Sequence, residues 1–269
     1  MSRLDRLHVT PGDKFRLDDF DPADKSVAPG DKAETAEKCG KLEERIGDLQ
    51  ELFFADHRRA LLIVLQGMDT SGKDGTVRHV MHLVSPLGVR AVPFKKPNET
   101  ELAHDYLWRI HSQVPAKGEV VIFNRSHYED VLVVRVHGYV PEKQWRKRYA
   151  QINDFERMLV ENGTVILKFF LHISKDEQRK RLQARIDDPT KRWKFQLGDV
   201  DERKLWKEYR EAYEEAVEKT STEHAPWIVV PADYKWVRNY VVAKTVVDTL
   251  EGLDMKYPDP PDLKGVVIE

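Results

Sequence analysis

The chain has little cysteine, no long apolar run and almost no net charge. Cys39 is the only cysteine among 269 residues, so no disulfide can form within the chain, which fits a reducing compartment. No stretch approaches the roughly 18 apolar residues of a membrane span. The first residues also lack the apolar run of a signal peptide. We therefore expect a cytoplasmic protein with no membrane segment.

The two signs of charge nearly cancel, with 44 Lys and Arg against 46 Asp and Glu and a net charge of −2. This balance argues against attraction of the whole protein to nucleic acid, so any polyanion site must be a local basic patch. What the chain does have is an apolar content of 41%, which can build the core of one large α/β domain.

Strand-like and helix-like patterns alternate along the chain. Continuous apolar strands, such as residues 120–123, suit a parallel sheet that is covered on both faces. The alternation predicts a doubly wound sheet of about five strands, with ligands at the carboxyl ends of the strands. Strands are expected over 61–66, 89–94, 119–124, 165–173 and 227–232. Helices are expected over 34–56, 73–84, 99–113, 142–161, 175–187, 201–218 and 235–250.

We expect three segments along the chain. Residues 1–32 are polar and contain three prolines, which predicts an extended arm that wraps the domain or pairs with a neighbour. Residues 33–252 hold the alternating strands and helices of the domain. Residues 253–269 predict an extended tail, which is either an oligomer contact or loose chain.

The most informative motif is the glycine-bracketed loop of residues 67–75, which follows an apolar strand. Backbone N–H groups of such a loop converge on phosphate oxygens, and the next helix adds the positive end of its dipole. Lys73 supplies a point charge for a bridging or terminal phosphate. The alternative is an ordinary glycine turn. The loop residues interpreted as phosphate-binding are Gly67, Thr70, Ser71, Gly72, Lys73, Asp74 and Gly75.

Two acids in this loop depart from the common pattern. Asp69 lies inside the loop, where a carboxylate would repel bound phosphate unless a cation lay between them. Asp74 follows Lys73, where a hydroxyl would normally hold Mg²⁺. We interpret Asp69 as a metal ligand and Asp74 as a weaker candidate. The alternatives are a turn residue that bonds its own backbone for Asp69 and a first-turn acid that favours the helix dipole for Asp74.

Polar residues follow the second and third strands. Arg125 is suited to phosphate because its planar fork stays charged, and Glu129 could orient a metal-bound water or an acceptor. The alternative is a solvated loop in which these two residues pair. At the second strand end, Lys95 and Lys96 could meet an anion and Phe94 could back a base ring. The alternative there is an exposed basic turn.

A basic region extends over residues 179–194. A mobile basic segment above a phosphate loop could close as a lid, exclude water and counter the charge of a transferring phosphoryl group. We place this lid at about residues 175–207. The alternative is a solvated helix balanced by its own acids. The basic residues proposed to contact phosphate here are Arg181, Arg185, Lys191, Arg192 and Lys194.

Taken together, these segments resemble the polyphosphate kinase 2 family. The matching stretches are residues 67–75, 94–97, 124–128, 188–194 and 221–227, in family order. The resemblance implies a P-loop kinase core with a helical lid. It also implies phosphate transfer between inorganic polyphosphate and a nucleotide, with Mg²⁺ or Mn²⁺, in a homo-oligomer such as a dimer or tetramer. It makes Asp69 and Lys73 the metal and phosphate residues of the loop, Arg125 a phosphate contact and Arg185 a lid arginine.

One departure from the family pattern concerns the third strand end. Many members have an Asp where this chain has Asn124, and an Asn where it has Glu129. An amide is a poorer Mg²⁺ ligand than a carboxylate, so the acid has in effect moved to Glu129. This variant resembles the subgroup that accepts both AMP and ADP. Two other functions stay open: an ATP-dependent P-loop kinase of small molecules or nucleotides, and a non-catalytic polyphosphate or nucleotide sensor.

Overall fold

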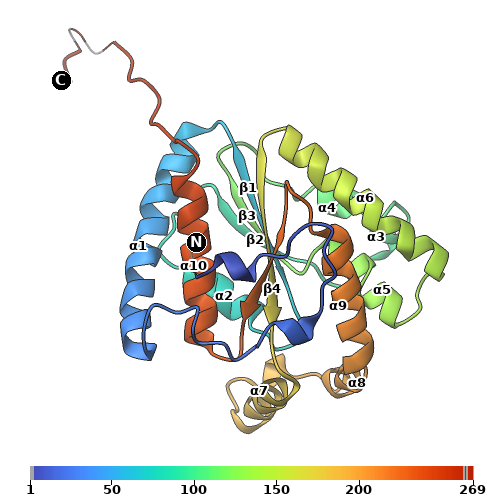
Figure 1. Cartoon of the computed structure of the whole chain (residues 1–269). Coiled ribbons are helices and arrows are strands. Elements are labelled where there is room, and N and C mark those ends of the chain that lie inside the picture. Colours follow the sequence, from blue (N-terminus) through green and yellow to red (C-terminus); the bar gives the residue numbers. More distant parts are fainter. Residues whose placement is uncertain (1–2, 263, 265, 269) are drawn as a thin grey trace.

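Five parallel strands form the central sheet of the protein, in the order β2-β3-β1-β4-β5. The structure is a computed structural model that describes residues 3–262, 264 and 266–268 (Figure 1). The strands lie within a residue of the predicted bounds, and the predicted α/β doubly wound class is confirmed. Their bounds are Ala60–Gln66 (β1), Val89–Pro93 (β2), Val120–Asn124 (β3), Thr164–His172 (β4) and Trp227–Pro231 (β5).

Helices cover both faces of the sheet. Along β1, Leu62 and Val64 face one core while Leu61, Ile63 and Leu65 face the other, because successive strand residues point to opposite sides. In Figure 1 the pair α1 and α10 lies on one side of the sheet and α6 with α9 on the other. The first layer consists of Lys32–Asp56 (α1), Lys73–Val80 (α2) and Lys235–Glu251 (α10). The second layer is built mainly from Glu142–Glu161 (α6) and Trp206–Thr220 (α9).

Three helix predictions were wrong in extent. The expected helix over 99–113 is two short helices, Glu99–Leu102 (α3) and Trp108–His111 (α4). The break follows from Asp105, whose carboxylate accepts the Leu107 N–H at 2.9 Å and so competes with helical bonding. A four-residue helix that we did not predict, Val133–Val136 (α5), follows β3.

The other two errors concern the end of α2 and the segment 201–218. Helix α2 ends at Val80 instead of residue 84. The side chain of Gln50 accepts the Ser85 N–H and donates to the Leu87 carbonyl, which holds that segment outside the helix. The expected helix over 201–218 is split at Leu205 into α9 and a short Gly198–Lys204 helix (α8). Helix α7 spans Lys175–Asp187, as predicted.

The N-terminal segment lies against its own domain. His8 forms an antiparallel bridge with Ile228 on the edge strand β5. Leu7 and Val27 are buried in the core beneath α1 and α10, and Leu17 in the opposite core. The described part of the tail extends away from the domain (Figure 1). Among the described helices, none combines the length and apolar character needed to cross a bilayer.

Candidate active site

The predicted phosphate loop lies at the carboxyl edge of the sheet, where the strand order changes direction. The chain leaves β1 into the loop, and β3 pairs directly with β1, with Leu65 opposite Asn124. The two polar segments predicted from the sequence therefore meet. Helices α7 and α8 lie beyond the same edge (Figure 1). In open α/β sheets a crevice at such a switch point is where ligands bind.

The backbone of the loop depends on its glycines. Gly67 has φ +149° and Gly72 has φ +103°, in regions that L side chains rarely adopt. A Cβ on Gly72 would also lie 1.8 Å from Nη1 of Arg238, far closer than van der Waals contact. Thr70 tolerates φ 64° between them. The loop therefore needs an unusual backbone conformation at three positions. An ordinary glycine turn would not need all three.

Lys73 is buried, with only 8% of the residue exposed. Its Nζ donates to the carbonyls of Gly67 at 2.6 Å and Met68 at 3.2 Å, across the loop. Burial, and then the nearby charge of Arg125, lowers the pKa of Lys73 to about 8. The side-chain hydroxyls of Thr70 and Ser71 are also buried, without a hydrogen-bond partner in the described structure. Unpaired buried polar atoms around a buried cation fit a cradle for an anion.

Arg125 lies between two carboxylates. Its Nη2 is 2.6 Å from Oδ1 of Asp69, and its Nη1 is 3.4 Å from Oε2 of Glu129. These two acids, Glu129 more than Asp69, raise the pKa of Arg125, so the guanidinium is always charged. The pairing of Arg125 with Glu129 was the alternative considered from sequence. It occurs here inside the cleft, together with the loop acid.

The acids of the site fit a divalent cation. Asp69 and Glu129 face one cationic group from two sides, and carboxylate oxygens are the ligands that Mg²⁺ prefers. Asp74 is exposed at the start of α2, and its Oδ1 accepts from Nδ2 of Asn124 at 2.6 Å. Asn124 therefore positions Asp74. We expect Asp69 and Glu129 to hold the metal, with Asp74 as a weaker candidate.

The rest of the cleft wall was missed from the sequence. Arg125 and Glu129 share a pocket with the loop and with residues of α7, α8 and α9. The Tyr209 hydroxyl donates to Glu202 at 2.7 Å. Aromatic residues at helical spacing usually belong to a core, so the sequence offered no distinguishing signal. The missed lining residues are Met68, Val133, Gln178, Glu202, Trp206, Tyr209 and Tyr213.

Arg181, a predicted phosphate contact, is bonded to the backbone in this structure. The guanidinium of Arg181 donates to backbone carbonyls of Thr70, Ser71, Ala232 and Asp233. It therefore braces the outside of the loop. Arg238, which we did not predict, is buried beside it and donates to the Ser71 carbonyl at 3.3 Å. Burial, and then Arg181, lowers its pKa to about 10.

The other predicted cations lie on the rim. The position of Phe94 argues against stacking on a nucleotide base. Its ring lies in the core, edge-on to the ring of Phe123, with 4.8 Å between the centroids. Arg185 lies 3.6 Å from Asp199 in α8, an ion pair that ties α7 to α8. The exposed basic residues of the rim are Lys95, Lys96, Lys191, Arg192 and Lys194. None of these five lines the cleft that contains Asp69, Arg125 and Glu129.

Comparison with known proteins agrees with this arrangement. The family model for polyphosphate kinase 2 matches residues 30–258. The AMP/ADP-polyphosphate phosphotransferase of Meiothermus ruber is 56% identical over 96% of this chain and 96% of its own length. The ADP-polyphosphate phosphotransferase of Rhodopseudomonas palustris is 46% identical over 80% and 79%.

A solved structure shows the same likeness in three dimensions. The crystal structure of polyphosphate kinase 2 from Arthrobacter aurescens matches with a TM-score of 0.93, at 46% identity, over 97% of this chain and 93% of that one. The family match covers the phosphate loop, the β3 end and helices α7 and α8 together. This chain belongs to the polyphosphate kinase 2 family.

Proposed function

We propose that the protein transfers the terminal phosphate of inorganic polyphosphate to AMP and to ADP, reversibly. The observation that carries this proposal is a cleft lined by Asp69, Arg125 and Glu129, whose charges all act on the buried Lys73 of the adjoining loop. Two cations and two acids around a phosphate loop suit phosphoryl transfer, in which positioning and charge neutralisation do most of the work. The names of its relatives indicate polyphosphate as donor.

Each residue has a part that its surroundings support. The Lys73 ammonium exchanges its two loop carbonyls for phosphate oxygens when the polymer end enters. Arg125 turns its fork from Asp69 toward the transferring group, where a planar guanidinium meets two oxygens at once. The attacking oxygen belongs to the nucleotide, so no covalent enzyme intermediate is needed. When bound, Mg²⁺ neutralises charge on the phosphates, and Asp69 and Glu129 are the residues that would hold it.

The acceptor range follows from Glu129. A carboxylate at this position, 3.4 Å from Arg125, can place a shorter nucleotide so that its terminal oxygen still faces the donor. The relative from Meiothermus ruber, whose name includes both AMP and ADP, supports a dual acceptor. The exposed rim cations, Lys95, Lys96 and Lys194 among them, offer a path for the rest of the polymer.

A donor assay separates this function from the two alternatives. Labelled polyphosphate with ADP should yield labelled ATP, and labelled ATP should pass its phosphate only back to polyphosphate. An ATP-dependent kinase would use ATP with a different acceptor and ignore the polymer, and a sensor would bind either ligand without transfer. Lys73→Met should abolish the reaction, while Lys41→Met, at an exposed lysine of α1, should leave it intact.

A further inference from the structure

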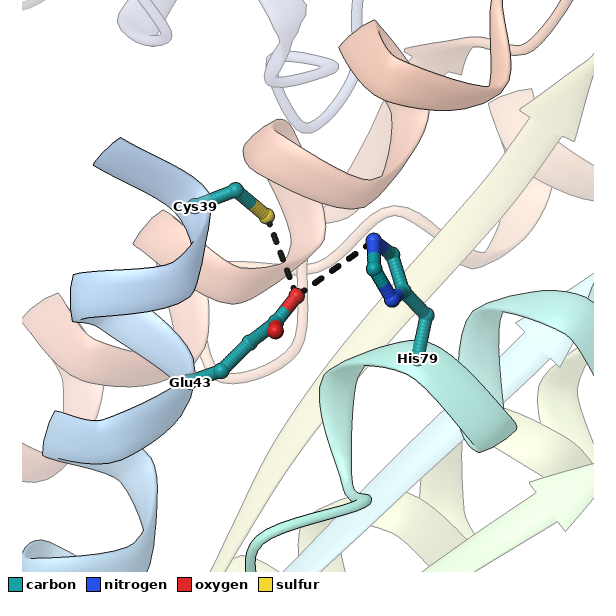
Figure 2. Close-up of side chains that lie close together, drawn as sticks. All are labelled: Cys39, Glu43 and His79. Carbon is teal, nitrogen blue, oxygen red and sulfur yellow. Dashed lines mark hydrogen bonds and ion pairs between the residues drawn. The ribbon is translucent and has the colours of Figure 1, made fainter. Parts of the chain in front are cut away.

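A second cluster of donor atoms lies between α1 and the end of α2, outside the cleft. Cys39 and Glu43 are one turn apart on α1, so they share a face of that helix. His79 lies in the last turn of α2 and points toward them (Figure 2). The ring of His82 follows just beyond the helix end and stacks on the ring of His79, with 6.2 Å between centroids.

The distances suit a metal ion. Sγ of Cys39 is 3.3 Å from Oε1 of Glu43, and Nε2 of His79 is 3.5 Å from the same oxygen. All three donor atoms lie within 4.8 Å of one another. Ligand atoms around a tetrahedral Zn²⁺ are roughly 3.3–3.8 Å apart, given bonds of about 2.0–2.3 Å. Small side-chain shifts would bring the three atoms to that spacing.

Burial and charge also point to a cation. Glu43 is 4% exposed and Cys39 is 3% exposed. Within the described structure, the ion pairs of Glu43 are those with His79 and His82, and no lysine or arginine pairs with it. A buried carboxylate is costly unless a positive charge compensates it. The imidazoles are about half exposed, at 48% and 44% of their side chains, which leaves a path for an ion to enter.

We propose that Cys39, Glu43 and His79 bind a Zn²⁺ ion. His82 lies 3.6 Å from the second oxygen of Glu43 and orients that carboxylate from outside, as second ligand shells commonly do. A thiolate and an imidazole select zinc over Mg²⁺, which takes oxygen ligands. The ion is therefore distinct from the metal of the cleft. It joins α1 to α2, the helix that begins at Lys73, and so steadies the base of the phosphate loop.

Cobalt replaces zinc as a coloured probe in the direct test. Full-length protein without a histidine tag is titrated with Co²⁺ in excess Mg²⁺, which saturates the cleft carboxylates. The expected result is one ion per chain, with a thiolate-to-cobalt charge-transfer band that Zn²⁺ removes. Cys39→Ser should lose the band, and His79→Gln should weaken binding at least tenfold. Two controls should bind normally: His104→Gln, at an exposed histidine elsewhere, and Asp69→Asn in the cleft.

The same titration can overturn the proposal. Absence of the band in the parent protein would reject the site. A band of equal affinity in His79→Gln would mean an isolated thiol contact, and loss of binding in Asp69→Asn would place the ion in the cleft. Zn²⁺ should also raise the thermal unfolding midpoint of the parent but not of His79→Gln. Because His79 is half exposed, that variant should fold even where Cys39→Ser does not.

Discussion

The guanidinium of Arg125 and the carboxylate of Asp69 lie 2.6 Å apart, although the two residues are 56 positions apart in the chain. Arg125 adopts a left-handed backbone conformation, with φ 63°, at the position that makes this contact. Such strain in a non-glycine residue is common where a site must hold one geometry. The pair joins the cation expected to meet phosphate with the acid expected to meet metal.

Replacement of Asp69 tests its role as a metal ligand. In Asp69→Asn we expect the Mg²⁺ concentration for half-maximal activity to rise by about tenfold or more, because an amide is a weaker ligand than a carboxylate. The fold should survive, since the Asp69 side chain is 30% exposed. The measurement is an Mg²⁺ titration of initial rate, with Asp201→Asn as the control at an exposed acid of α8. A titration curve equal to that of the parent would remove Asp69 from the metal site.

The buried lysine predicts a pH dependence. Because the pKa of Lys73 is lowered to about 8, the ligand-free enzyme loses this cation as the pH rises through that value. Bound phosphate favours the charged form of Lys73. The loss of activity at high pH should therefore be larger in kcat/KM, which reports the free enzyme, than in kcat. We expect kcat/KM for polyphosphate to fall above about pH 8. Lys73→Arg should lack this fall if it retains activity. A flat profile through this range would contradict the role of Lys73.

Alanine substitutions at two glycines of the loop should have opposite effects on activity. Gly72→Ala places a Cβ at a strained φ of +103° and against the Arg238 guanidinium, so the loop backbone or that side chain must shift. We expect about a hundredfold or greater loss of turnover, in line with the loss of a preorganised charge-stabilising group. Gly75→Ala lies within α2, where a Cβ would approach Arg238 no closer than 3.4 Å, and should retain most activity. Turnover of both variants is measured by steady-state kinetics, and their folding is checked by circular dichroism. Equal activity in the two variants would contradict a requirement for glycine at position 72.

The sequence predicted elements well and long-range partners poorly. All five strands and the exact bounds of α6 and α7 followed from apolar runs and helical spacing. The meeting of the loop with the β3 end followed from general rules for doubly wound sheets. The partners of Arg181 could not be foreseen, because they are backbone carbonyls from two distant segments. Trp206, Tyr209 and Tyr213 of α9 line the cleft because of the way that helix packs on the domain. The sequence of the helix alone does not show which of its faces meets the cleft.

Glu129 is expected to set the acceptor range. Glu129→Asn should reduce the reaction with AMP more than the reaction with ADP, by about tenfold, because the shorter nucleotide depends more on being positioned. The measurement is kcat/KM for each nucleotide at saturating polyphosphate. Asp130 is a poor control because it pairs with Arg148 at 3.0 Å, so Asp201→Asn serves again. Equal losses for AMP and ADP would reject this role of Glu129 and leave the donor assignment untouched.

The transfer activity can be measured by supplying only AMP, Mg²⁺ and polyphosphate, free of adenylate kinase, and following the nucleotides by chromatography. We expect ADP to form first and ATP to follow, with both reactions abolished in Lys73→Met. Failure of the parent enzyme to form ADP would contradict the dual-acceptor claim. Failure to form ATP from ADP and polyphosphate as well would contradict the assignment of this cleft as a polyphosphate phosphotransferase site.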